Sequence, residues 1–353
     1  NYYSKFNSYL WPVKTKILII YTGGTIGMVM DIRTNTLVPF DFEHLYKQVP
    51  ELEKFDLELS VNSFEEPIDS SDMTIDAWKK MATIIQQNYQ LYDGFVILHG
   101  SDTMAYTASA LSFMLENLAK PVILTGSQLP IGMIRTDGKE NLITAIEIAS
   151  ARHNNLPVIN EVAIYFEYKL YRGNRTHKYN AEHFDAFKSP NYPMLAEAGI
   201  KIEYNQTALF PKPETYLNVR LNMDGNIGVL KLFPGITPAV VQSVLQSKGL
   251  KALIIETFGS GNGPTQDWFI HEIEEAIKTR NLTILNVTQC NQGAVNQGRY
   301  ATSKGLLKAG VIGGNDITFE AAITKLMYLF GNLTDKNEIE KYLQISLRGE
   351  MSV

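Results

Sequence analysis

The chain has 353 residues, and its composition of 45% hydrophobic and 20% charged residues is typical of a globular protein. A net charge of −5 without a basic block argues against nucleic acid as a partner, and no apolar run approaches the ~20 residues that span a membrane. The length predicts two domains, because single hydrophobic cores rarely grow past ~250–300 residues.

The first predicted element is a buried strand over Lys16–Tyr21, which leads into the turn Thr22–Gly27. Two adjacent glycines let the backbone turn sharply and approach a ligand, and they leave the Thr25 hydroxyl beside free backbone N–H groups. The dinucleotide-binding fingerprint fails because Thr22 occupies its first glycine position. A structural turn and a catalytic threonine are both open interpretations here. The next residues, 28–39, are predicted to form a polar loop of the length expected for a lid.

A predicted strand over Phe55–Phe64 leads into the polar run Asp69–Asp72. Helix capping accounts for part of the polarity here, because Thr74 is a good N-cap for a helix over Ile75–Tyr89. Capping does not account for the two hydroxyls of Ser70 and Ser71. These two residues are therefore candidates for ligand binding.

Two further buried strands, Phe95–Leu98 and Pro121–Leu124, also end in glycine and hydroxyl residues. The first leads into the sequence HGSDT and a helix predicted over Met104–Leu118, and the second leads into TGSQ. The carboxyl ends of parallel strands lie at the edge where α/β sheets bind ligands. These two turns and the turn of Thr25 together predict one shared site.

A strand over Glu161–Phe166 precedes the basic run Lys169–Lys178, KLYRGNRTHK. Charged runs usually form a solvated face, and this is the favoured interpretation for Arg172 and Arg175. We expect the run to form a hairpin that returns over the sheet edge. Such a hairpin would bring Lys178 back to the predicted site.

The alternation of elements breaks down over residues 205–224, which are predicted to be a linker. The linker separates an N-terminal α/β catalytic domain over 16–204 from a smaller α/β domain over 225–353. In the second domain the glycine-rich loops GSGNGPT and TQCNQG again follow strand ends. The single cysteine, Cys290, excludes an intrachain disulfide. It favours a reducing compartment, and because the first sixteen residues lack the apolar segment of a signal peptide, we expect a cytoplasmic protein.

The predicted site offers hydroxyl groups, one carboxylate and one amine, from Thr25, Ser70, Ser101, Asp102 and Lys178. The histidine spacings give no metal-binding pattern, and the serine-hydrolase elbow G-x-S-x-G is absent from the sequence. A hydroxyl nucleophile without histidine needs another base, and a desolvated lysine held by a carboxylate supplies one. This set suits acyl transfer, with backbone N–H groups of the glycine turn as an oxyanion hole.

Five segments make the chain resemble the bacterial-type L-asparaginases: YTGGTIG, PIDSSDMT, ILHGSDTMAYTASALSFMLENL, KPVILTGSQ and LYRGNRTHK, in this order. The type I, cytoplasmic branch matches best, over essentially Lys16 to Met351. The resemblance implies hydrolysis of L-asparagine to L-aspartate and ammonia without a cofactor or metal. It also implies an α/β fold with a larger doubly wound N-terminal domain and a smaller flavodoxin-like C-terminal domain. The implied assembly is a homodimer or homotetramer.

The resemblance also implies catalytic roles. Thr25 matches the nucleophile, which forms a β-aspartyl ester and releases ammonia. Ser101, Asp102 and Lys178 match a second set that handles protons and activates water. The implied oxyanion hole is the backbone at Gly24, Thr25 and Ser101.

Substrate-binding roles follow in the same way. Ser70 and Ser71 match the pair that holds the α-carboxylate and amino end of asparagine, and Asp102 pairs with the α-ammonium group. Asn262 matches a residue that reaches the substrate from a neighbouring subunit. A zwitterionic substrate needs both a carboxylate and several donors, which this set provides.

The sequence departs from the family pattern at several positions. Ser101 stands where the family usually has threonine. Serine keeps the hydroxyl group, but its side-chain rotamer is less restricted than that of the β-branched threonine. Leu37 aligns with a lid tyrosine. Glu256 and His177 stand where activated type I relatives use an arginine and a threonine to bind an effector, so we expect hyperbolic dependence on asparagine.

Two other function classes compete with asparagine hydrolysis. The tRNA-dependent amidotransferase subunit shares this core but carries an additional N-terminal domain, and only about fifteen residues precede Lys16 here. A non-catalytic amino-acid sensor or nucleotide-binding protein would have the same sheet edge. Ammonia release from asparagine separates an enzyme from a sensor.

Overall fold

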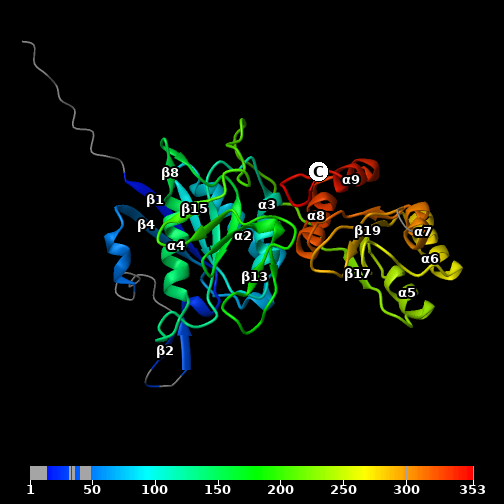
Figure 1. Cartoon of the computed structure of the whole chain (residues 1–353), viewed down its shortest axis with the longest axis horizontal. Helices are drawn as coiled ribbons and strands as arrows, with labels where there is room; N and C mark the ends of the chain where they lie inside the picture. The colour runs from blue at the N-terminus through cyan, green and yellow to red at the C-terminus, as the bar shows by residue number, and fades with distance from the viewer. Residues whose placement is uncertain (1–13, 32, 34–35, 40–48, 299–300, 353) are drawn as a thin grey trace, which may run out of the picture.

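The computed structural model describes residues 14–31, 33, 36–39, 49–298 and 301–352. Two lobes lie side by side, the N-terminal lobe drawn in blue to green and the C-terminal lobe in yellow to red (Figure 1). Each lobe has its own sheet and its own hydrophobic clusters. The predicted α/β fold with a larger first domain and a smaller second domain is confirmed.

The N-terminal lobe is built on an eight-stranded sheet in the order β15-β14-β11-β10-β7-β5-β1-β4. The strands from β10 to β4 in this order run parallel, and the other three complete the sheet in antiparallel pairs. The parallel strands are β1 (Thr15–Tyr21), β4 (Leu57–Ser63), β5 (Gly94–Leu98), β7 (Val122–Thr125) and β10 (Val162–Phe166). The antiparallel strands are β11 (Lys169–Arg172), β14 (Ala196–Ala198) and β15 (Ile202–Tyr204).

Helices cover both faces of this sheet. In β1, Leu18 and Ile20 join the cluster under α2 (Ile75–Asn88) and α3 (Met104–Met114). Ile17 and Ile19 point the other way and join the cluster under α4 (Gly138–Ser150), as expected of successive residues in a strand. The predicted N-cap of α2 is confirmed, because the Thr74 hydroxyl accepts a hydrogen bond from the N–H of Ala77 at 3.2 Å.

The helix predicted over Met104–Leu118 is shorter than expected. It ends at Met114, whose carbonyl accepts a hydrogen bond from the N–H of Arg220 at 2.9 Å. The next residues form β6 (Leu115–Glu116), which pairs with β16 (Asn218–Val219). Part of the predicted linker is therefore paired to the N-terminal lobe, and this pairing replaces the last helical turn.

The prediction of a polar loop over residues 28–39 is wrong. The backbone forms an antiparallel hairpin of β2 (Met28–Asp31) and β3 (Thr36–Pro39), which projects from the lobe in Figure 1. The polar residues of the segment suggested a loop, although short runs of β-branched and aliphatic residues, which favour strands, lie on each side of the turn. Leu37 pairs with Met30 in this hairpin, and its side chain lies outside the described part of the chain.

The C-terminal lobe has a parallel four-stranded sheet in the order β17-β18-β19-β20. Its strands are β17 (Ile227–Lys231), β18 (Ala252–Thr257), β19 (Thr283–Thr288) and β20 (Ile312–Gly313). One face packs on α5 (Pro238–Leu245), α6 (Asp267–Arg280) and α7 (Ala301–Ala309), and the other on α8 (Phe319–Asn332) and α9 (Lys336–Leu343). Helix α8 contacts α3 of the other lobe, where the rings of Tyr328 and Phe113 stack at 5.9 Å.

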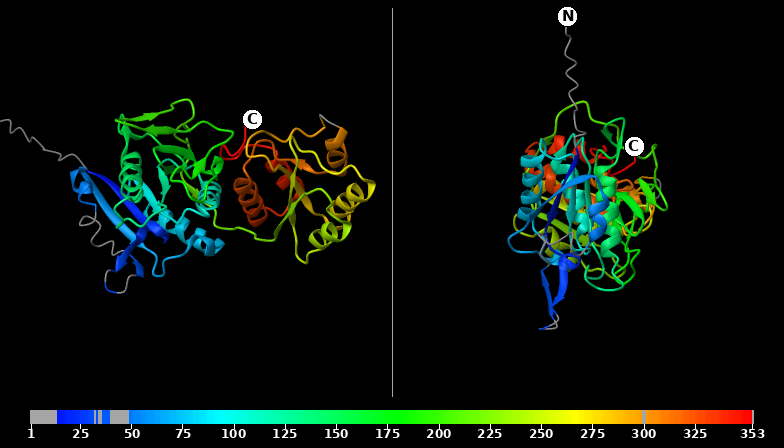
Figure 2. Two further views of the ribbon diagram at one scale, coloured as in Figure 1. Left: turned by 60° about the horizontal axis from the view of Figure 1, so that its bottom comes forward. Right: turned by 90° about the vertical axis from the view of Figure 1, so that its left-hand side faces the viewer.

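The segment 345–352, which we call the C-terminal tail, lies between the lobes (Figure 2). It is fixed by an ion pair of 2.7 Å between Lys325 and Glu350, whose side chains are both fully buried. Glu350 in turn accepts hydrogen bonds from the N–H groups of Leu347 and Arg348. The Arg348 guanidinium forms an ion pair of 2.7 Å with Glu116 in the N-terminal lobe, so the tail links the two lobes.

Candidate active site

The loops after β1, β5 and β7 lie next to one another at one edge of the N-terminal sheet. The strands pair in parallel, so that Tyr21 lies opposite Leu98 and Leu98 lies opposite Thr125. Hydrogen bonds of 3.0 Å continue past the strand ends, from the N–H of Thr22 to Leu98 O and from the N–H of His99 to Thr125 O. The predicted convergence of the three turns is therefore observed.

Glycines allow these loops to touch through their backbones. A Cβ placed at Gly24, where φ is +84°, would lie 2.4 Å from the nitrogen of Gly100. A Cβ at Gly100 would lie 2.5 Å from the Ser70 Oγ, and one at Gly23 only 2.1 Å from the oxygen of Ile68. Any larger residue would force the loops apart, so the glycines fix how closely the candidate groups approach.

Thr25 stands at the first position of a short 3-10 turn, η1 (Thr25–Gly27), directly after Gly24. The turn closes with a hydrogen bond of 3.2 Å from the N–H of Gly27 to Gly24 O. Thr25 is only half-buried, whereas the next residue, Ile26, is 1% exposed and anchors the turn in the core. The turn thus presents the Thr25 side chain at the sheet edge from a fixed backbone.

Lys178 completes a hydrogen-bonded set with Ser101 and Asp102. Its Nζ lies 2.6 Å from Asp102 Oδ1 and donates to Ser101 Oγ at 2.9 Å. The lysine side chain is 16% exposed and that of Asp102 is 64% exposed, so the pair opens to the solvent on the carboxylate side. An amine at hydrogen-bonding distance from a hydroxyl is positioned for proton transfer.

The route of the chain explains how Lys178 reaches this place. Strand β11 folds back on β10, and the short turn η5 (Gly173–Arg175) leads into β12 (His177–Lys178), which pairs with β13 (Phe187–Lys188). The expected return of the basic run over the sheet edge is therefore observed.

The expectation that Arg172 and Arg175 lie on a solvated face is wrong, because these residues are only 3% and 2% exposed. Arg172 pairs with Glu161 at 2.6 Å. Arg175 pairs with Asp316 at 2.9 Å and donates to the carbonyl of Gly349 at 2.7 Å. Partners outside the basic run neutralise both guanidinium groups, and the run of charges itself gives no sign of them.

Ser70 and Ser71 lie in the turn η4 (Ser70–Asp72), against the loop after β5. Ser70 is 3% exposed, and its carbonyl accepts a hydrogen bond from the Thr103 hydroxyl at 2.6 Å. Ser71 is exposed and donates from its N–H and its hydroxyl to Asp69 Oδ1, at 2.9 and 2.8 Å. These two bonds hold the pKa of the Asp69 carboxyl below its usual value, the backbone bond contributing most. Asp69 thus caps the turn that holds both serines in place.

Asn262 lies in the loop after β18 in the C-terminal lobe. Its backbone exchanges hydrogen bonds of 2.9 and 2.8 Å with Phe258. The predicted contact of Asn262 with substrate requires a second copy of the chain, and it stays a prediction.

His99, which supports the loop after β5, was not identified as a functional residue from the sequence. His99 is fully buried, and burial lowers the pKa of its imidazole to about 4, so the ring is neutral. Its Nδ1 lies 2.6 Å from Gly100 O, which only accepts, so Nδ1 carries the proton and Nε2 accepts from the Thr107 hydroxyl at 2.8 Å. Trp78 Nε1 donates to the same hydroxyl at 2.9 Å. This chain of bonds orients Gly100 and hence Ser101.

Gln128 was also missed, although it ends one of the predicted turns. Its Oε1 lies 3.5 Å from Ser101 Oγ, and its Nε2 donates to the carbonyl of His183 at 3.0 Å. Asp137 accepts from the backbone N–H of Gln128 and fixes this turn. Gln128 therefore borders the Ser101 hydroxyl on the side away from β1.

The two residues at the family's effector position have partners within the chain. Glu256 lies 3.7 Å from Lys231 Nζ, and His177 Nδ1 lies 2.6 Å from Glu320 Oε1. The bond to Glu320 raises the pKa of the His177 imidazole above its usual value of 6.5. Glu256 thus has a cation partner of its own, and the expected hyperbolic dependence on asparagine stays a prediction.

Metal-binding clusters and membrane-spanning helices are both absent from the part of the chain that the structure describes. There, no group of three or more histidine, cysteine, aspartate or glutamate residues could hold a metal ion. Within the same residues, no helix is both long enough and apolar enough to cross a bilayer.

Comparisons with known proteins match the whole two-lobe architecture. Residues 16–210 match the family model described as asparaginase, N-terminal, and residues 226–343 match the glutaminase/asparaginase C-terminal domain. L-asparaginase 1 of Escherichia coli K12 is 46% identical over 96% of this chain and 98% of its own length. The 60 kDa lysophospholipase of Mus musculus is 41% identical, with 96% of this chain and 63% of that protein covered. The crystal structure of L-asparaginase I from Vibrio cholerae superposes with a TM-score of 0.87 at 42% identity, covering 96% and 100% of the two chains.

Proposed function

The chain belongs to the asparaginase family and hydrolyses L-asparagine to L-aspartate and ammonia, and we propose that Thr25 is its nucleophile. The observation that carries the assignment is the set of Lys178, Asp102 and Ser101 beside the glycine turn of Thr25. Family membership supplies the reaction, with a threonine nucleophile and an acyl-enzyme intermediate. The geometry of this edge supports the proposed roles.

We propose the following use of these groups. The Thr25 hydroxyl attacks the side-chain amide carbon, and cleavage of the C–N bond releases ammonia and leaves a β-aspartyl ester on Thr25. Water then attacks the ester carbon, which releases aspartate and restores the hydroxyl. Lys178, oriented by Asp102, exchanges protons through the Ser101 hydroxyl, to which it donates at 2.9 Å. Backbone N–H groups at Gly24, Thr25 and Ser101 stabilise the oxyanion.

Substrate binding is proposed on the same edge. Ser70 and Ser71 hold the α-carboxylate and amino end, and Asp102, with its side chain 64% exposed, pairs with the α-ammonium group. Asn262 of a neighbouring copy completes the pocket. We propose a cytoplasmic homodimer or homotetramer with domains over 16–204 and 225–353 and a linker over 205–224.

Steady-state ammonia release tests the proposed function. L-asparagine, L-glutamine and D-asparagine are compared at known protein concentration, and we expect L-asparagine to have the highest kcat/KM with hyperbolic dependence. Binding of asparagine without ammonia release would point to a sensor instead. Light scattering at assay concentration tests the assembly, because a fully active monomer contradicts the shared site.

Mixing two inactive variants tests the role of Asn262 more directly. Thr25→Ala and Asn262→Ala disable different halves of a shared site, so subunit exchange regenerates sites in which both residues are intact. We expect the mixture to regain part of the lost activity. No regain after proven exchange would mean that both residues act within one copy.

A further inference from the structure

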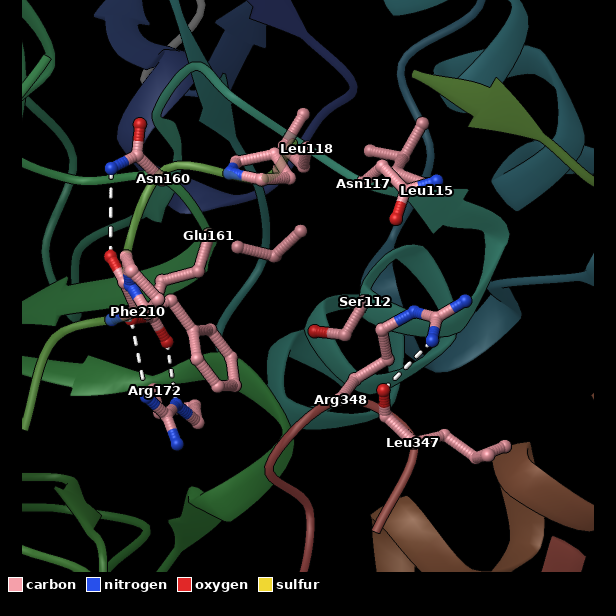
Figure 3. A pocket seen from close by; sticks show the side chains of 13 residues that line it. Ser112, Leu115, Asn117, Leu118, Asn160, Glu161, Arg172, Phe210, Leu347 and Arg348 are labelled. Carbon is pink, nitrogen blue, oxygen red and sulfur yellow. Dashed lines mark hydrogen bonds and ion pairs between the residues drawn. The ribbon is translucent and has the colours of Figure 1, made fainter. Parts of the chain in front are cut away.

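A second cavity, of about 210 Å³, lies at the opposite edge of the N-terminal sheet from the catalytic loops. We call it the tail cavity, because Leu347 and Arg348 of the C-terminal tail form part of its wall (Figure 3). Its other walls are the last turn of α3, the residues before β7 and at the start of β10, and the segment 210–213. None of the proposed catalytic residues lines it.

The tail cavity is lined mainly by apolar side chains, including Leu115, Leu118, Val162, Phe210 and Leu347. An apolar cavity of about 150 Å³ is large enough to hold a benzene ring. A volume of about 210 Å³ therefore suits one ring or a short alkyl chain with a few further atoms.

One wall of the cavity carries no net charge. Arg172 donates to Glu161 at 2.6 Å, and both side chains are at most 5% exposed. The guanidinium of Arg172 also lies over the Phe210 ring, 3.7 Å from its centroid. Figure 3 shows Glu161 and Phe210 on this side and Ser112 and Arg348 on the other. The paired charges leave this wall without an electrostatic preference for an ion.

The opposite wall keeps a positive charge. Glu116 is the shared partner of Arg348 and Arg220, at 2.7 and 3.1 Å, and also accepts from the Tyr328 hydroxyl at 2.7 Å. Burial works to raise the pKa of the Glu116 carboxyl, but these partners outweigh it and hold the pKa below its usual value. One carboxylate thus faces two guanidinium groups, of which Arg348 lines the cavity and Arg220 is 44% exposed, so Glu116 neutralises the charge of Arg348 only in part.

Arg348 also has a donor to spare. Its Nη1 donates to Leu347 O at 2.7 Å and its Nη2 to Glu116 at 2.7 Å. Its Nε is buried and has no hydrogen-bond partner among the residues that the structure describes, so a ligand in the cavity would have to reach the second N–H groups of Nη1 and Nη2. A buried donor without an acceptor is unfavourable, and an unpaired N–H on a charged group more so.

We propose that the tail cavity binds a small monocarboxylate with an apolar body. The carboxylate accepts from the Arg348 guanidinium and neutralises the remaining positive charge, while the ring or chain packs against the leucines and Phe210. Asparagine and aspartate do not fit this description, because each would bury further charged or polar groups against apolar walls. The site is thus distinct from the asparaginase site in both place and ligand chemistry.

Calorimetry on the whole chain with phenylacetate as the probe tests the proposal. Saturating L-aspartate is present, so that the asparaginase site is occupied. We expect phenylacetate to bind, and the neutral phenylacetamide to bind roughly tenfold or more weakly, because a hydrogen bond to a charged group is lost. Phenylacetate binding that is seen only when aspartate is left out, equal binding of the amide, or no binding to the folded protein would each overturn the proposal.

Variants of the two walls locate the binding. Arg348→Met removes the charge and should weaken phenylacetate roughly tenfold or more, and Arg348→Lys, which keeps the charge, should bind more tightly than Arg348→Met. Ser112→Leu fills the cavity and gives up only a bond to Ala108 O within its own helix. It should abolish binding while ammonia release from asparagine and the thermal unfolding midpoint are retained. Unchanged affinity in folded Ser112→Leu would refute the site, whatever the fate of the Arg348 variants.

Discussion

Both lobes end their parallel strands in loops rich in glycine and hydroxyl residues, but the polar groups of the two edges have different partners. In the C-terminal lobe they satisfy one another. The Thr257 hydroxyl donates to Asn286 Oδ1 at 2.6 Å, and Asn286 Nδ2 donates to Gly261 O at 3.2 Å. Thr257 and Asn286 are both fully buried. Their bonds stabilise the edge of this sheet and leave these two side chains with no group to offer a substrate.

At the edge of the N-terminal sheet, a lysine from a distant segment gives the polar groups a different partner. Lys178 lies 76 residues from Asp102 in sequence and pairs with it at 2.6 Å, next to the half-buried Thr25. Glycine and hydroxyl residues at strand ends therefore indicate where a sheet edge lies. A lysine and carboxylate brought to that edge indicate where chemistry takes place.

The largest expected effect comes from removing the proposed nucleophile. Thr25→Ala should lower kcat for ammonia release by roughly a thousandfold or more, because loss of a nucleophile typically costs several decades of rate. Thermal unfolding and aspartate binding should stay close to wild type, since the side chain is only half-buried. More than a tenth of wild-type activity would rule out Thr25 as the nucleophile.

Ser101 provides the next test of the catalytic edge. Ser101→Ala removes the hydroxyl that accepts from Lys178 and should lower kcat by about 10²–10⁴-fold, the usual contribution of a proton-transfer group. Ser101→Thr keeps the hydroxyl and should retain most of the activity. If both variants are equally inactive in the ammonia assay, the position has a steric role and does not transfer protons.

Thr257→Ala is the matched change in the C-terminal lobe. It leaves Asn286 Oδ1 without its buried donor and should lower the free energy of unfolding by ~1–3 kcal/mol. The kcat of the folded enzyme should stay unchanged, which is the reverse of the expectation for Thr25→Ala. Urea unfolding and the ammonia assay measure the two effects. A large loss of kcat without loss of stability would show that this edge also takes part in chemistry.

The smallest expected effect concerns His177, which precedes Lys178, the proposed catalytic lysine. Its bond to Glu320 raises the pKa of the imidazole above 6.5, so the folded state holds the proton more tightly than the unfolded state. The resulting stability is fully present below pH 6.5 and is lost as the pH rises through the folded pKa. In urea unfolding at about room temperature, the difference in free energy of unfolding between wild type and His177→Gln should therefore become smaller from pH 5.5 to pH 9. A difference that grows with pH would contradict the pairing.

The convergence of the strand-end loops was predictable because parallel strands with buried sequences place their carboxyl ends at one edge. The return of Lys178 to the sheet edge was expected from a hairpin over the basic run Lys169–Lys178. The burial of Arg175 was not predictable, since its partner Gly349 lies 174 residues away. The hairpin over residues 28–39 was missed for a different reason. The segment was predicted to be a loop from its polar residues, although its short aliphatic runs favour strands.

The bonds between Arg175 and the C-terminal tail set an order of events during synthesis on the ribosome. Arg175 cannot donate to Gly349 until that residue, 174 positions later, has been made. At ~5–20 residues per second this delay is on the order of ten to thirty seconds. During that interval the segment that carries Lys178 lacks its final anchor, so the nascent N-terminal lobe emerges before its active site is complete. We therefore expect the proposed site around Lys178 to be completed late, after both lobes have been translated.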